Sequence, residues 1–100
     1  MILHIDTSDA EKIIVGLDNK KFTTQSRKDK SQKLLLFIDE LLKKEGFGHH
    51  DISEIKVSTG PGSFTGLRVG VSVANALGWS LGISVNGRRV EKGFVEIKYE

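Results

Sequence analysis

The sequence predicts an α/β domain built on a mixed, five-stranded sheet with two main helices. Three short strand patterns come first, separated by tight polar turns, which is typical of an antiparallel meander. Two long helical patterns then alternate with further strand patterns, as they do in crossover connections between parallel strands. Together these observations indicate a meander joined to a crossover unit in one sheet.

Length and composition limit the possible functions. A chain of 100 residues suits one compact domain, and 38% hydrophobic with 28% charged residues is ordinary for a globular protein. The absence of cysteine excludes a disulfide framework and any thiolate zinc site. The net charge of +2 is small and its basic residues are interleaved with acids, so charge alone does not indicate nucleic acid. We expect a cytoplasmic protein without a membrane segment, because no apolar run approaches the ~18 residues of a transmembrane helix.

The first half of the chain is predicted as three strands and a helix. Residues 2–5, 11–17 and 21–27 have strand patterns, and a helix starts near Asp29 or Ser31. The apolar arc of this helix contains Leu34, Leu35, Phe37, Ile38, Leu41 and Leu42. Leu36 lies off that arc and is expected to be exposed.

Two adjacent histidines, His49 and His50, follow the first helix. Metal binding is one interpretation of such a pair. Adjacent side chains on a loop diverge, however, and no further ligand cluster is visible nearby, so we predict no metal site.

A glycine-rich stretch connects the fourth strand, residues 55–58, to the second helix, residues 67–81. The predicted structural loop consists of Gly60, Pro61, Gly62, Ser63, Phe64, Thr65 and Gly66. Phosphate binding at the helix N-terminus is one interpretation. The Walker and dinucleotide fingerprints do not fit, because Leu67 follows Gly66 and the glycine spacing is one residue too long. A tight turn that fixes the helix against the sheet, with Ser63 and Thr65 as caps, is favoured.

The second helix has three distinct rows of side chains. Its apolar side contains Val69, Val73, Leu77 and Leu81. Small residues recur four apart at Gly66, Gly70, Ala74 and Gly78, which predicts a close approach by a neighbouring element. The polar row contains Arg68, Ser72, Asn75 and Trp79. Trp79 either lies against a loop or the C-terminal segment, or anchors a partner.

The last residues are predicted to form strands. Residues 83–85 give a fifth strand, Asn86-Gly87 is a strong hairpin signal, and residues 88–92 can return as a strand. Residues 94–99 alternate in polarity, so we expect another strand there.

The stretch Gly-Pro-Gly-Ser-Phe-Thr-Gly-Leu-Arg-Val-Gly at residues 60–70 resembles the hallmark of the TsaB family. Members of this family are accessory subunits for the threonylcarbamoyladenosine modification of tRNA. Residues 1–8 look like the first strand of the family, and residues 31–42 look like its first helix. The resemblance covers residues 1–86.

The resemblance implies a fold and a domain organisation. It implies one half of the actin-like, sugar-kinase-like ATPase fold, which is ribonuclease-H-like, with a sheet ordered 3-2-1-4-5. The chain is then a single domain over residues 1–100, with the family's N-terminal domain at 1–86. A β-like tail at 87–100 takes the place of the second domain that these proteins usually carry.

The resemblance also implies a non-catalytic role. In the family, the catalytic partner TsaD carries the metal-binding histidines and the nucleotide site, and this chain has no H-x-x-x-H pair. We therefore predict no catalytic residue, no cofactor and no metal. Asp6, where ATPases of this fold place a metal-associated acid, is expected to cap a turn. The implied partners are a TsaD-type subunit, a TsaE-type ATPase through the complex, and a second copy of the chain, with tRNA contacted only indirectly.

The predicted partner interface lies on the two helices. It comprises Leu34, Phe37, Ile38, Leu41, Gly66, Arg68, Gly70, Val73, Ala74, Leu77 and Trp79.

Two other functions compete with this one. Asp6 and the glycine loop are also compatible with a minimal nucleotide-binding or ATPase-like enzyme. Direct tRNA binding is a weaker alternative, because no aromatic residues accompany the basic ones. The basic residues in question are Arg27, Lys28, Lys30, Arg88, Arg89 and Lys92.

Overall fold

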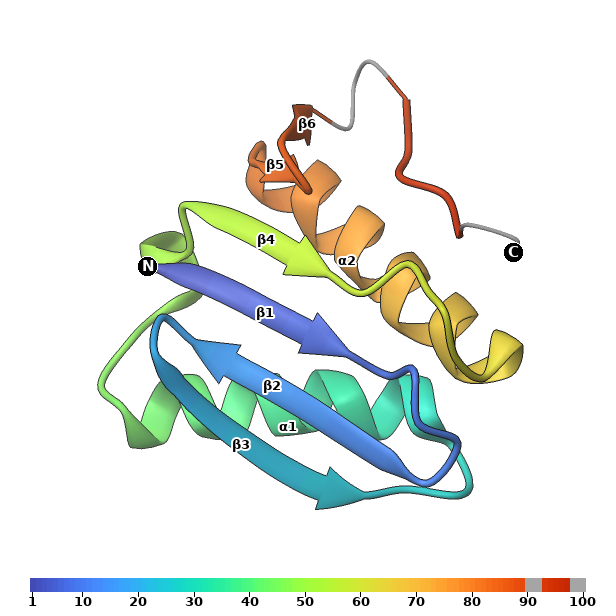
Figure 1. Ribbon diagram of the computed structural model, residues 1–100. Coiled ribbons are helices and arrows are strands. Elements are labelled where there is room, and N and C mark those ends of the chain that lie inside the picture. The colour runs from blue at the N-terminus through green and yellow to red at the C-terminus, as the bar shows by residue number, and fades with distance from the viewer. Residues whose placement is uncertain (90–92, 98–100) are drawn as a thin grey trace.

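The computed structural model describes residues 1–89 and 93–97. Its strands are β1 (Ile2–Asp6), β2 (Lys12–Leu17), β3 (Lys20–Gln25), β4 (Glu54–Val57), β5 (Ser84–Val85) and β6 (Arg88–Arg89). Its helices are α1 (Lys30–Lys44) and α2 (Phe64–Leu81), with a short 3-10 turn at His49–Asp51. The elements therefore follow the predicted order, and the meander and both crossovers are present (Figure 1).

The strands form one mixed sheet in the order β3-β2-β1-β4-β5-β6. β1, β2 and β3 pair antiparallel, whereas β4 pairs parallel with both β1 and β5. The predicted order 3-2-1-4-5 is confirmed, and β6 extends the sheet by one strand through the predicted hairpin. Asn86 (φ 51°) and Gly87 (φ 78°) form its turn, as the positive φ angles of a tight hairpin require.

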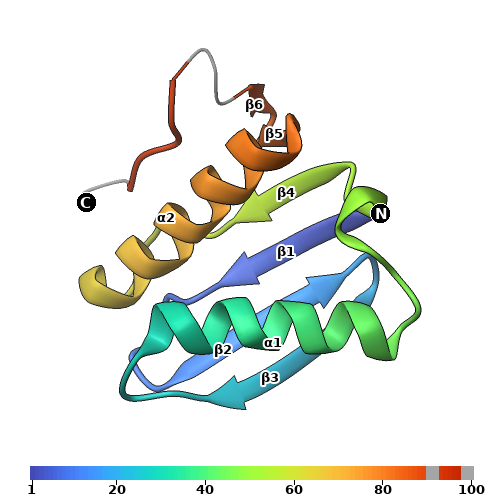
Figure 2. The same cartoon turned by 180° about the vertical axis from the view of Figure 1, so that it is seen from behind.

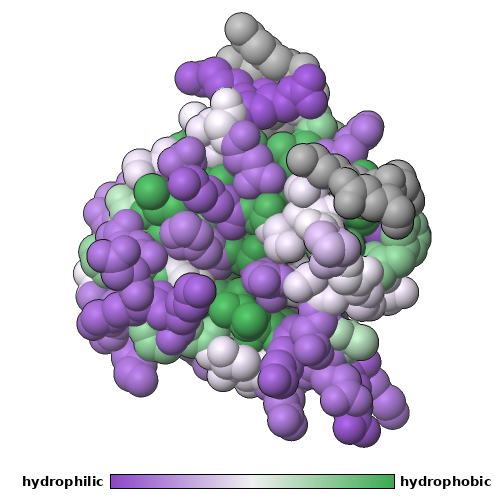
Figure 3. Space-filling model, in the orientation of Figure 1, coloured by the Kyte–Doolittle hydropathy of each residue, from purple (hydrophilic) through white to green (hydrophobic). Residues whose placement is uncertain are grey.

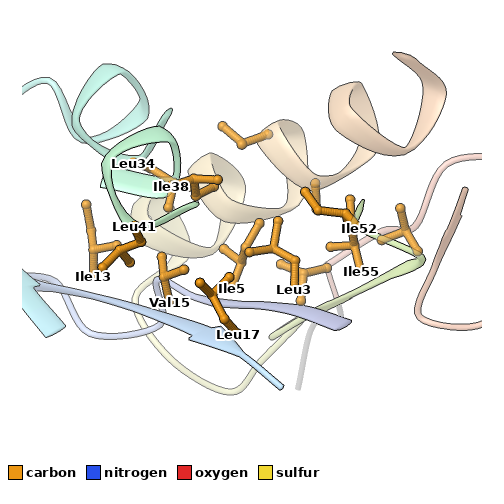
Figure 4. Close-up of a cluster of buried hydrophobic side chains, with 14 of the residues drawn as sticks. Leu3, Ile5, Ile13, Val15, Leu17, Leu34, Ile38, Leu41, Ile52 and Ile55 are labelled. Atoms are coloured by element: carbon orange, nitrogen blue, oxygen red, sulfur yellow. The ribbon is translucent and has the colours of Figure 1, made fainter. Parts of the chain in front are cut away.

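Both helices cover the same face of the sheet, and the opposite face is open (Figures 1 and 2). Alternate strand residues point toward the helices and form the core with the inner sides of α1 and α2 (Figure 4). Leu3, Ile13, Val15, Leu34 and Ile55 have no exposed surface at all. Neither helix of the described part combines the length and hydropathy that crossing a bilayer requires.

The prediction of a further strand in the tail is wrong for its described part. Residues 93–97 have no strand structure and lie along α2 instead. The side chain of Asn75 on α2 donates to the Val95 carbonyl (2.9 Å) and accepts from the Val95 amide (3.1 Å). Val95 and Ile97 pack against the core, so the alternation of the tail reflects burial on a helix. The rest of the predicted strand lies outside the described residues.

The Asn75 contact gives a first prediction. Asn75→Ala removes both hydrogen bonds to Val95, so we expect residues 93–97 to become mobile and the free energy of unfolding to fall by about 1 kcal/mol. Heteronuclear NOE values for these residues and a chemical denaturation curve measure the two effects. Ser72→Ala, at an exposed position on the same helix, is the control. Unchanged NOE values in the Asn75 variant would show that apolar contacts alone hold the tail.

Candidate functional site

The glycine-rich turn is seated against the loop that follows β1. The Ser63 amide donates to the Ser8 carbonyl at 2.7 Å. A Cβ on Gly62 would lie 2.7 Å from the same carbonyl oxygen, and its φ of 155° also favours glycine. The Ser63 hydroxyl accepts from the Gly66 amide (3.3 Å) and caps α2, as predicted. The prediction of Thr65 as a second cap is wrong, because α2 begins at Phe64 and includes the last three residues of the predicted loop. This geometry is that of a structural turn that fixes α2 at the end of the sheet.

Two glycines of α2 complete this attachment. A Cβ on Gly66 would collide with the Thr7 carbonyl oxygen, and a Cβ on Gly70 would collide with the Thr7 hydroxyl. Thr7 is fully buried, and its hydroxyl donates to the Gly66 carbonyl at 2.6 Å. Gly66 and Gly70 of the small-residue row therefore pack against Thr7, the residue that follows β1 in the same chain.

Asp6 caps the turn after β1, as predicted. Its Oδ1 accepts from the amide (2.9 Å) and the hydroxyl (2.6 Å) of Ser8. This local pattern fixes the backbone of a turn. Within the described residues, no group of three or more histidine, cysteine, aspartate or glutamate side chains is placed to hold a metal ion.

The adjacent histidines face different carboxylates. His49 Nε2 lies 3.9 Å from Asp39 Oδ1 on α1, and His50 Nε2 lies 3.7 Å from Asp51 Oδ1 in the 3-10 turn. The two imidazoles therefore do not converge on a common point.

Most residues of the predicted interface lie inside the chain. The buried ones are Leu34, Ile38, Leu41, Gly66, Gly70, Val73 and Ala74, while Phe37 and Leu77 are partly buried against the core. Arg68 and Trp79 are exposed, Trp79 by 64%. The surface available to a partner is therefore not the apolar arc itself but the outward side of the helices.

The outward side of α1 and α2 carries an exposed set of large side chains. We call Leu35, Leu36, Phe64, Arg68 and Trp79 the helix-pair surface. Leu36 is exposed, as predicted, and Leu35, although on the predicted apolar arc, is 48% exposed. The guanidinium carbon of Arg68 lies 5.7 Å from the centre of the Phe64 ring, which is a cation–π contact.

A hollow of about 390 Å³ lies beside Arg68 between the two helices. Ser31 of α1 and Thr65, Arg68, Val69 and Ser72 of α2 line it. Its lining is mostly hydroxyl-bearing, and its one cation is already in contact with Phe64. The hollow and the apolar side chains around it form an amphipathic surface, which is the composition typical of protein interfaces.

The basic residues of the direct tRNA alternative do not form one surface. Lys30 donates to the Asp9 (2.7 Å) and Ala10 (3.2 Å) carbonyls, and Arg27 pairs with Glu11 at 3.2 Å. Arg88 and Arg89 lie on β6, at the far edge of the sheet from β3. Lys92 lies outside the described residues. The proposed set is thus divided between distant places, and part of it is engaged in contacts within the chain.

The sheet order, the one-sided pair of helices and the turn seated on β1 define one half of an actin-like ATPase fold. A family model described as "TsaD: tRNA N6-adenosine threonylcarbamoyltransferase" matches residues 22–87. The chain belongs to this family, and its relatives within it are TsaB proteins.

Several relatives support this assignment. The chain is 36% identical over 89 residues to the tRNA threonylcarbamoyladenosine biosynthesis protein TsaB of Bacillus subtilis, covering 85% of this chain and 39% of that protein. It is 34% identical over 50 residues to TsaB of Escherichia coli, covering 50% of this chain and 22% of that protein. The structure of YeaZ from Pseudomonas aeruginosa superposes with a TM-score of 0.69 at 25% identity, over 84% of this chain and 41% of that one. The chain spans about two fifths of the length of the Bacillus and Pseudomonas proteins.

Proposed function

We propose that this chain is a non-catalytic partner of a TsaD-type subunit in the threonylcarbamoyladenosine modification of tRNA. The observation that carries the proposal is the helix-pair surface. It places two exposed leucines on α1, and on α2 an exposed tryptophan and a phenylalanine in contact with an arginine. Tryptophan and arginine are enriched among residues that dominate binding energy, and large exposed apolar groups favour burial against a partner.

The site chemistry supports an accessory role rather than an enzyme. Asp6 Oδ1 accepts two hydrogen bonds within its own turn, Gly62 is closely packed against Ser8, and Gly66 at the start of α2 is closely packed against Thr7. The Ser63 amide, one of the backbone donors that the ATPase-like alternative could use, is engaged in holding the start of α2. In this proposal the complex is cytoplasmic, a TsaE-type ATPase meets this chain only through it, and two copies pair through the same surface when TsaD is absent.

The proposal predicts a one-to-one complex with the TsaD-type protein of the same organism. Size-exclusion chromatography with light scattering detects the complex, and calorimetry gives its dissociation constant. Trp79→Ala and Arg68→Ala are each expected to weaken binding by about thirtyfold, because loss of a central anchor costs about 2 kcal/mol. Both residues are exposed, so the fold of the chain alone is expected to be unchanged.

Phe47→Ala is the matched control, since Phe47 is an exposed aromatic residue beyond the end of α1. It is expected to leave the affinity within twofold. No complex at micromolar concentrations would contradict the proposal. So would ATP hydrolysis by the chain alone that is abolished by Asp6→Ala.

A further inference from the structure

The open face of the sheet carries a straight row of four residues across four strands. Lys21 on β3 pairs with Gly16 on β2, Gly16 pairs with His4 on β1, and His4 pairs with Lys56 on β4. Paired residues point to the same side of a sheet, and Leu3 and Ile5 beside His4 point to the core. Three strand spacings separate the two lysine α-carbons by about 14 Å.

In the middle of this row the His4 side chain covers Gly16, which has no side chain and is buried. A Cβ at Gly16 would lie 3.0 Å from the His4 Cβ and 3.4 Å from two atoms of its ring. The imidazole therefore leans over the backbone of β2 and forms one wall of a hollow of about 330 Å³. Ile14 contributes to its apolar floor. Figure 3 shows this face, with hydrophobic surface between hydrophilic side chains.

Lys21 and Lys56 line the hollow as two cations beside one acid, Asp6. Within residues 1–89 and 93–97, neither side chain makes an ion pair or a hydrogen bond. Asp6 is the acid that lines the hollow, and both hydrogen bonds from Ser8 go to its Oδ1. Its Oδ2 is left as an acceptor, and the Ser58 hydroxyl lies in the same lining.

We propose that this row binds one nucleotide unit of a single-stranded RNA on the open face of the sheet. The base lies on the His4 ring beside Ile14, and the flanking phosphates contact Lys21 and Lys56. Stacking of unpaired bases on aromatic rings, including histidine, beside basic residues is the usual chemistry of single-strand recognition.

The remaining groups of the hollow favour RNA over other anions. Asp6 Oδ2 can accept from the exocyclic amine of a base, as acidic side chains do with cytosine, whereas it repels a simple anion or an acidic peptide. The Ser58 hydroxyl can bond to a 2′-hydroxyl, the group that distinguishes RNA from DNA. A hollow of this size is also within the range of small-ligand sites.

Fluorescence anisotropy with a labelled six-nucleotide RNA of mixed A and C tests the proposal at 50 mM and 200 mM salt. Binding by the unaltered chain is expected at 50 mM salt. Lys21→Ala/Lys56→Ala is expected to weaken it at least tenfold and to reduce the salt slope by about 1.4, since each phosphate contact to a single strand contributes about 0.7. His4→Ala is expected to weaken binding at least fivefold with an unchanged slope, because it removes stacking and not a phosphate contact.

Lys33→Ala/Lys44→Ala is the matched control. It removes the same charge from exposed positions of α1, on the other side of the sheet, and is expected to change the affinity less than twofold. Equal weakening by both lysine pairs, equal binding of DNA of the same sequence, or competition by inorganic phosphate as strong as that by AMP would each overturn the proposal. So would a lack of binding at 50 mM salt. Only this chain and RNA are present, so the outcome is independent of complex formation with TsaD.

Discussion

Gly70→Leu is expected to destabilise the isolated chain by about 3 kcal/mol, which lowers the melting temperature by roughly 12–24 °C for a domain of this size. The reason is that a Cβ at this position already collides with the Thr7 hydroxyl, and Ile5 lies 3.4 Å away on the same side. Thr7 is fully buried, so the larger side chain has no solvent-exposed direction in which to move. Thermal unfolding followed by circular dichroism measures the effect.

Ala76→Leu is the matched control, because it introduces the same side chain at an exposed position of the same helix. It is expected to change stability by no more than about 0.5 kcal/mol. Thr7→Ala removes the hydroxyl that the new Cβ meets, so its cost and that of Gly70→Ala should not add. An unchanged melting temperature in Gly70→Leu would mean that Gly70 does not face Thr7.

The small-residue row of α2 allowed the sequence to predict close packing but not the residue that packs there. Spacing of four residues places Gly66 and Gly70 on one face of a helix and predicts close packing there. It does not identify the occupant, because helical periodicity is the same whether that occupant is a partner or the same chain. The occupant is Thr7, which contacts Gly66 across 59 positions of the sequence. Only the three-dimensional path of β1 brings the two together.

The sheet was predictable because its signals are local. Turn residues such as Asn86-Gly87 and the period of the apolar residues specify each strand and its connection. The tail was predicted less well, because alternation shows that Val95 and Ile97 are buried but not what satisfies the backbone between them. Here the Asn75 side chain supplies both hydrogen bonds that a neighbouring strand would otherwise make. A helix can thus hold an extended segment that has the pattern of a strand.

The sequence could not separate core residues from partner-facing residues on α1, because the apolar arc of this helix is wide. An arc that includes both Leu34 and Leu35 spans more than the sheet can cover, since consecutive residues are about 100° apart on a helix. The structure buries Leu34 completely and leaves Leu35 half exposed. The same periodicity therefore contained core and surface residues that the sequence could not separate. The open-face row was missed for a related reason, because pairing between β3, β2, β1 and β4 is not visible in any one strand.

Leu34→Ala is expected to destabilise the isolated chain strongly and Leu36→Ala hardly at all, although the two leucines are only two residues apart. Leu34 is fully buried, so its truncation leaves a cavity and is expected to cost about 3 kcal/mol, or roughly 12–24 °C in melting temperature. Leu36 is 55% exposed, so its truncation is expected to change stability by less than about 0.5 kcal/mol. Denaturant unfolding of the isolated chain measures both.

The two variants also separate a core role from a partner role. If the helix-pair surface binds a TsaD-type subunit, Leu36→Ala weakens that complex by tenfold or more while the isolated chain keeps its stability. Leu34→Ala then affects the complex only through the fraction of unfolded chain, so its apparent loss of affinity disappears at temperatures well below its melting point. A complex that tolerates Leu36→Ala but is lost with Leu34→Ala in fully folded chain would instead place the contact on the inner side of α1. That result would require α1 to separate from the sheet when the partner binds, because Leu34 has no exposed surface in the isolated domain.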